Sequence, residues 1–117
     1  MNGRDIVILN KIYDYCQEIR KTHHFFAKNK DLFMDKEEGY IYRNSITMPI
    51  LQIGELTKLL SDDFLNENKN IPWKMIMRMR DVVAHHYGSL DLEIVWNTSI
   101  DDIVDLEEEV SKYRKDF

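Results

Sequence analysis

The chain is organised around residues 72–88, which read PWKMIMRMRDVVAHHYG. Apolar residues recur along this stretch at three- and four-residue steps, a spacing that predicts one face of a helix. Pro72 suits the first turn of a helix, and Gly88 suits its C-terminal end. We therefore expect a helix from about Trp73 to Tyr87.

The end of this helix concentrates chemically active side chains, namely Arg80, His85, His86 and Tyr87. Together they could cleave RNA without a metal ion. A histidine can move a proton near neutral pH, and an arginine can stabilise the charge that develops on a phosphate. Tyr87 can donate a hydrogen bond or stack on a base. His86, or a second copy of the chain, could supply the second histidine that acid–base chemistry needs.

The position of Arg80 leaves two readings open. It lies on the apolar face of the helix, where a charge is unfavourable unless it is paired. Either this face borders an open groove, or a carboxylate such as Glu55 pairs with the arginine. If it is paired, Arg80 could be purely structural, with the histidines capping the end of the helix.

Arg80 and His85 lie five residues apart, about 140° around a regular helix. For the two side chains of one chain to share a phosphate, the helix must end or tighten at its last turn. Alternatively, a two-fold partner supplies the second half of the site.

The rest of the chain predicts more helices and no strands, because no stretch alternates with period two. We expect an all-α fold, a four- to five-helix up-and-down bundle. The expected segments are a helix over 5–28, a polar connection over 29–39 with an apolar docking segment at 32–34, a helix over 40–60, a loop over 61–70 with room for one helical turn at 64–65, a helix over 73–87, a short helix or turn over 90–96 and a last helix over 99–116.

Five positions carry local expectations. Pro49 should kink the second helix, and Gly54 suggests a close approach of another helix. His23 and His24 are expected to be solvated at the end of the first helix, and Ser99 is expected to cap the last one.

Size and composition indicate one soluble domain over residues 1–117. The chain is 44% hydrophobic and 32% charged, with no membrane-spanning stretch and no signal peptide pattern. One cysteine, Cys16, excludes an internal disulfide, falls on an apolar face and fits the cytoplasm. A net charge of −5 means that any RNA binding needs a local basic patch. Motifs for metal binding, a glycine-rich phosphate loop or a cofactor are absent, so we expect no metal and no cofactor.

Four segments, in order, resemble HepT-like toxins of the HEPN superfamily. Arg80, His85 and Tyr87 are spaced as R-x4-H-x-Y, which is similar to the signature of that family. The other three segments are IGELTKLLS at 53–61, IPWKMIMRMR at 71–80 and DLEIVW at 91–96. Together the four cover about residues 46–110.

The resemblance implies a HEPN bundle that forms a homodimer with its two signatures facing each other in a cleft. It implies a metal-independent endoribonuclease toxin with Arg80 and His85 as the catalytic pair. It also implies an antitoxin, a minimal nucleotidyltransferase of the MNT type, that transfers AMP to Tyr87. A non-catalytic helical partner of such a nucleotidyltransferase, or a purely structural bundle, are the alternatives.

Two residues depart from the family pattern. Asp81 follows the signature arginine where the family usually has asparagine, and a carboxylate beside a phosphate site should weaken cleavage. Pro49 stands in a helix that is usually free of proline.

Overall fold

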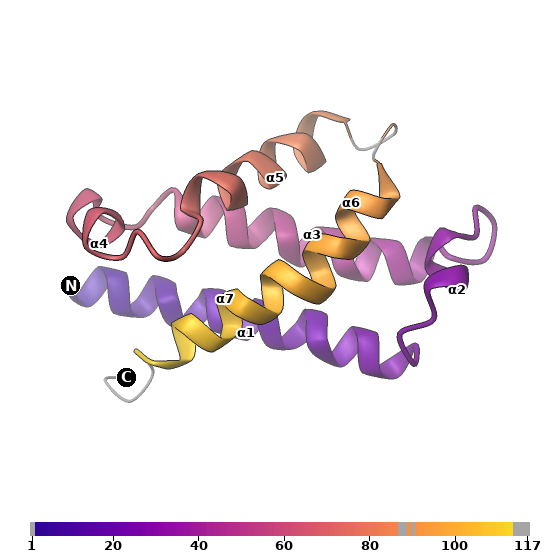
Figure 1. Ribbon diagram of the computed structural model, residues 1–117, viewed down its shortest axis with the longest axis horizontal. Helices are drawn as coiled ribbons and strands as arrows, with labels where there is room; N and C mark the ends of the chain where they lie inside the picture. The colour runs from indigo at the N-terminus through magenta and orange to yellow at the C-terminus, as the bar shows by residue number, and fades with distance from the viewer. Residues whose placement is uncertain (1, 87–88, 90, 114–117) are drawn as a thin grey trace.

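The protein is an all-α bundle (Figure 1). The structure is a computed structural model that describes residues 2–86, 89 and 91–113. No strand occurs in these residues, which confirms the expected fold class. The helical segments are α1 (Gly3–Phe25), α2 (Lys30–Met34), α3 (Tyr40–Thr57), α4 (Asp62–Glu67), α5 (Trp73–His86), α6 (Leu92–Asn97), η2 (Thr98–Asp102) and α7 (Ile103–Ser111).

The long helices alternate in direction, as the up-and-down topology requires. In Figure 1, α1 and α5 run from left to right, while α3 and the α6–α7 segment run back. The short helices α4 and α2 lie at opposite ends of the molecule. The C-terminal ends of α1 and α5 therefore lie toward the same end of the bundle.

The core forms around α3, which packs on both α1 and α5. Phe33 of the short α2 is fully buried, so the predicted docking of that segment is confirmed. Cys16 is also fully buried, and it belongs to the core as expected. Other hydrophobic side chains with less than 2% exposure are Leu9, Ile12, Ile19, Tyr42, Ile46, Ile53, Phe64, Val83, Val95 and Val110.

The last part of the described chain differs from the prediction at Ser99. The backbone stays helical from α6 through η2 into α7, and η2 is one π-helical turn. Ser99 lies inside this turn and donates a hydrogen bond to the Trp96 carbonyl (2.7 Å), so the prediction that Ser99 starts a new helix is wrong. No new helix begins at Ser99 because the backbone is already helical on both sides of it, so no free backbone N–H groups are left there for the side chain to cap.

His23 contradicts the expectation of a solvated side chain, because it is only 3% exposed. One ring nitrogen, Nδ1, shares a hydrogen bond with the Tyr42 hydroxyl, and Nε2 shares one with Ser99 Oγ at 2.8 Å. Trp96 packs edge-on against the ring. Two polar partners make burial of the imidazole favourable. His24, the next residue, is exposed as expected.

Asp5 joins the start of α1 to the start of α4. Its carboxylate is 1% exposed and accepts hydrogen bonds from the Ser61 backbone N–H (2.9 Å) and hydroxyl (2.7 Å). It also completes a capping box with Asn2. This contact ties together segments 56 residues apart.

Helix α3 continues without a break through Pro49, which is buried. The kink expected there stays a prediction. Across the described residues, none of the helices combines the length and the apolar character needed to cross a membrane.

His23 predicts a loss of stability in mild acid. Burial, and secondly the Lys28 ammonium, lower the pKa of His23 to about 4 from an ordinary value of 6.5. As pH falls from 6.5 toward 4, His23 becomes protonated in the unfolded chain but stays neutral in the folded protein. This favours the unfolded state, so the free energy of unfolding decreases. Thermal unfolding should show a fall in Tm of about 5 °C or more over this range.

Replacing His23→Gln should flatten that pH dependence while lowering Tm at pH 7.5. His24→Gln, at the exposed neighbouring position, is the control and should keep the wild-type slope. An unchanged slope in His23→Gln would show that other groups control acid stability.

Candidate functional site

Arg80, the first residue of the predicted cluster, lies where α5 packs against α3. Gly54 of α3 faces Arg80 of α5 so closely that a Cβ on Gly54 would overlap Arg80 Cβ and lie 2.7 Å from Arg80 Cγ. The expectation that Gly54 permits a close helix approach is therefore confirmed. Because Gly54 has no side chain, the Cβ and Cγ of Arg80 fit between the two helices.

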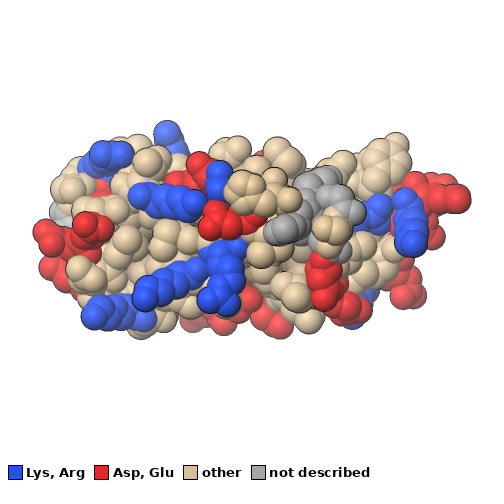
Figure 2. All heavy atoms as spheres, turned by 90° about the horizontal axis from the view of Figure 1, so that it is seen from above, with Lys and Arg blue, Asp and Glu red and all other residues tan. Residues whose placement is uncertain are grey.

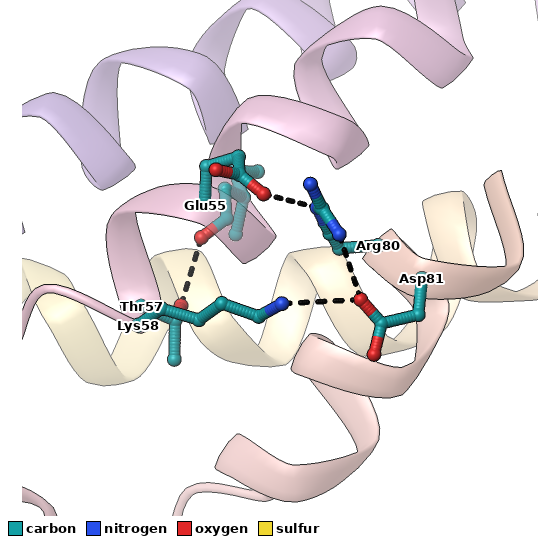
Figure 3. Close-up of polar contacts among 6 residues, drawn as sticks. Glu55, Thr57, Lys58, Arg80 and Asp81 are labelled. Atoms are coloured by element: carbon teal, nitrogen blue, oxygen red, sulfur yellow. Dashed lines mark hydrogen bonds and ion pairs between the residues drawn. The ribbon is translucent and has the colours of Figure 1, made fainter. Parts of the chain in front are cut away.

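Arg80 lies between two carboxylates (Figure 3). Its Nε forms an ion pair with Oε1 of Glu55 on α3. Its Nη1 donates to Oδ1 of Asp81 at 2.9 Å. The Arg80 side chain is 23% exposed, so the guanidinium is largely sheltered yet reaches the surface. The sequence left open whether Arg80 faces an open groove or pairs with a carboxylate, and the structure shows it paired.

Lys58 completes a cluster of four charges. Its Nζ lies 3.1 Å from the same Asp81 oxygen that binds Arg80. Hydrogen bonds from Arg80 and then from Lys58 hold the pKa of Asp81 below its ordinary value. Two cations and two carboxylates sum to zero, so the cluster carries no net charge at neutral pH.

The structure does not bring His85 to Arg80 within one chain. Helix α5 is regular from Trp73 to His86, so it neither ends nor tightens before His85. His85 is exposed, and helix geometry places it about 140° around the axis from Arg80. The described helix therefore lacks the tightened last turn that one of the two predicted arrangements needs.

The other predicted site residues lie at the edge of the described chain. His86 is the last residue of α5. Tyr87 lies outside the described residues, as does Gly88, so the predicted modification site cannot be placed against the cluster.

The outer face of α5 carries exposed lysine, arginine and histidine side chains. Lys74, Arg78 and His85 are exposed and recur at steps of four and seven residues, which puts them on one side of the helix. Figure 2 views the molecule from above, the side on which α5 lies, and shows basic and acidic side chains side by side there. This face is mixed in charge, and its cations lead along the helix toward His85.

This arrangement could bind a phosphate by exchange of partners. A guanidinium that already bonds a carboxylate can offer the same donors to a phosphoryl oxygen, since both acceptors fit its planar fork. In such an exchange Asp81 would give up Nη1, and Lys58 would remain beside it to hold the displaced carboxylate. In the described residues, no group of three or more His, Cys, Asp or Glu side chains is placed to hold a metal ion.

Sequence reasoning missed Lys58 as part of the cluster. It follows Glu55 by three residues, so the two share a face of α3 and its immediate continuation. That spacing was the available signal. It could not reveal the link to Asp81, which depends on how α5 crosses α3.

The sequence was compared with models of known protein families and with known proteins. The family model described as "Ribonuclease HepT-like" matches residues 12–113. No solved structure matches the chain significantly.

Similar proteins occur in Thermococcus cleftensis and Methanocaldococcus jannaschii. "Probable ribonuclease HepT" of Thermococcus cleftensis is 31% identical over 86 residues, which cover 74% of each chain. "Putative RNase MJ0125" of Methanocaldococcus jannaschii is 32% identical over an alignment that covers all of this chain and 97% of the relative. "Putative RNase MJ0127" of the same organism is 38% identical over 65 residues, 56% of this chain and only 54% of the relative.

Gly54→Ala should destabilise the protein, although alanine is intrinsically the better helix former. The new methyl group must push Arg80 and α5 away, a cost of about 1–3 kcal/mol against a helix gain of about 1 kcal/mol. Urea unfolding measures the difference. Gly3→Ala is the control, because a Cβ there meets nothing within 4 Å. Equal stabilities for the two variants would show that α5 does not need the bare backbone at Gly54.

Proposed function

The chain belongs to the ribonuclease HepT-like family of the HEPN superfamily, and we propose that it is an endoribonuclease and the toxin of a toxin–antitoxin pair. It cuts RNA without a metal ion. The observation that carries the proposal is the partly sheltered guanidinium of Arg80. It is held at the surface by Glu55 of α3 and Asp81 of α5, and α5 also carries His85.

In the proposed reaction, the ribose 2′-hydroxyl attacks the adjacent phosphate and the 5′-oxygen leaves. His85 takes the proton from the attacking hydroxyl or delivers one to the leaving oxygen, as an imidazole can near neutral pH. Arg80 exchanges Asp81 for a phosphoryl oxygen and stabilises the growing negative charge. The product carries a 2′,3′-cyclic phosphate.

We further propose that the active form is a homodimer. One copy cannot aim Arg80 and His85 at the same phosphate along a regular α5, whereas a facing copy can supply the missing group. Exposed Ile41 and Met48 support this view, being 56% and 49% exposed. They precede Glu55 at seven-residue steps, so the three share one stripe of α3 that leads to the charge cluster.

The proposed antitoxin is an MNT-type minimal nucleotidyltransferase, and Tyr87 is the residue that it would modify with AMP. Family membership and the position of Tyr87, two residues after His85, support this assignment. A phosphate-bearing group there would add negative charge beside the proposed catalytic histidine and repel RNA. The cytoplasm is the proposed location, since it holds both the RNA and the partner.

One observation favours a second candidate function. Asp81 and Glu55 both engage Arg80, so the free protein holds its proposed phosphate ligand in a neutral cluster. A chain that kept this arrangement permanently would be a non-catalytic helical partner of the nucleotidyltransferase. The Asp81 substitution described below separates the two candidates.

Wild-type protein should cleave single-stranded RNA in the presence of EDTA. His85→Ala should lower the rate by at least about 100-fold, since positioned acid–base groups contribute about that much or more. Gel analysis measures the rate, and the products should carry 2′,3′-cyclic phosphate ends.

Thermal unfolding of His85→Ala provides the control, because His85 is exposed and its loss should not change Tm. Cleavage by this variant at the wild-type rate would refute the proposed mechanism.

Asp81→Asn should raise kcat/KM for RNA several-fold. The amide keeps the size of the side chain but frees Nη1 of Arg80 from its charged partner and removes repulsion of the phosphate. Steady-state cleavage assays at low salt measure the change, with Asp14→Asn, exposed on α1, as the charge-matched control. No cleavage by either wild type or Asp81→Asn would favour the non-catalytic candidate.

A further inference from the structure

A second surface stands apart from the α5 cluster, at the C-terminal end of α1. A concavity of about 620 Å³ opens there, and the described residues that line it include no carboxylate. The chain as a whole has an acidic excess, with 21 acidic and 16 basic residues. The lining residues are Arg20, Lys21, His23, His24, Ala27 and Lys28.

The basic side chains at this concavity differ in whether another group already pairs with them. Arg20 is paired with Glu107 of α7 at 3.2 Å, and His23 is buried among neutral partners. Lys21 and Lys28 are exposed at the surface, with His24 between them in sequence. The local excess of positive charge therefore comes from these two lysines.

Lys28 occupies a backbone position where glycine is the ordinary residue. Ala27 and Lys28 have φ values of 55° and 50°, in the left-handed region. The Lys28 N–H donates to the His23 carbonyl at 2.8 Å, which fixes the backbone at the helix end. The lysine side chain thus starts from a defined point at the rim of the concavity.

An exposed aromatic ring lies beside these lysines. Phe25 is 81% exposed, more than any other large hydrophobic side chain in the described residues. It follows Lys21 by four residues, so the two are neighbours on the same face of α1. Its ring contacts Phe26 edge-to-face, and Phe26 in turn stacks on the buried Tyr42. Phe25 is therefore supported by packing against Phe26, while most of its ring surface is exposed to solvent.

We propose that this end of α1, formed by Lys21, His24, Phe25 and Lys28, is a platform that binds single-stranded RNA. The lysines contact phosphates and Phe25 stacks on an unpaired base, the combination by which proteins hold single strands. A duplex does not expose base faces and fits the platform less well. The choice of RNA as ligand rests on the proposed ribonuclease function.

The platform lies toward the same end of the bundle as the end of α5 (Figure 1). The cross-section of the molecule there is set by its two shorter extents, 27 and 19 Å. A single strand held at Phe25 could therefore continue across this end of the protein toward His85. The platform would hold the substrate, and the α5 cluster would act on it.

The test measures binding without cleavage. The probe is a fluorescent oligonucleotide of about twelve 2′-O-methyluridines, which cannot be cut because the attacking hydroxyl is blocked. Fluorescence anisotropy with wild-type protein should show binding that weakens with salt. Lys21→Glu combined with Lys28→Glu should lower affinity at least about tenfold and reduce the salt dependence, because about two phosphate contacts are lost.

Phe25→Ala should lower affinity by about fivefold to 100-fold, the usual effect of removing one stacking ring. Lys11→Glu, an exposed charge reversal earlier on α1, is the matched control and should stay within about twofold of wild type. All the substituted residues are exposed, and Tm should confirm that each variant folds.

Affinities of the Phe25 and lysine variants equal to that of Lys11→Glu would overturn the proposal. So would equal binding of a duplex of the same length. If the lysine variant keeps its affinity for the oligonucleotide but loses affinity for polyglutamate, the surface binds an acidic protein instead. Because the probe cannot be cut, the platform can be upheld even if wild type proves to have no ribonuclease activity.

Discussion

The close contact between Gly54 and Arg80 fixes how α5 lies on α3, and the proposed site depends on it. A bare backbone at Gly54 admits the base of a long charged side chain into the space between two helices. In this position Arg80 forms ion pairs with Glu55 of α3 and with Asp81 of α5. A charge at a helix contact is tolerated because both partners are carboxylates, and the guanidinium still reaches the surface.

Pairing with carboxylates also orients the guanidinium of Arg80. A guanidinium held by carboxylates is already oriented, so a phosphate that replaces one of them meets a donor in a fixed position. In the proposed exchange, Lys58 would keep Asp81 close by while Arg80 bonds the phosphate. Asp81 would then compete with the phosphate for Arg80 and set how readily the phosphate binds.

Much of the fold could be read from the sequence, because helical periodicity and the scarcity of glycine and proline leave few alternatives. The long helices, the docking of Phe33, the burial of Cys16 and the role of Gly54 were all predictable from pattern. The errors occurred where tertiary packing decides. His23 looks like a solvated helix end, but Tyr42 and Ser99, distant in sequence, satisfy its ring inside the core. The link from Lys58 to Asp81 was hidden for the same reason, while the roles of Arg80 and His85 stay predictions.

The π-helical turn over Thr98–Asp102 gives the last helix a property that a regular helix lacks. Such a turn accommodates an extra residue without interrupting the helical backbone. In a regular helix, one added residue would rotate everything beyond it by about 100°. The wide turn absorbs this rotation, so Ile103, Leu106 and Val110 stay buried on the side of the segment that packs on the bundle. The turn therefore lets the sequence carry one more residue while the end of the described chain keeps its register with the other helices.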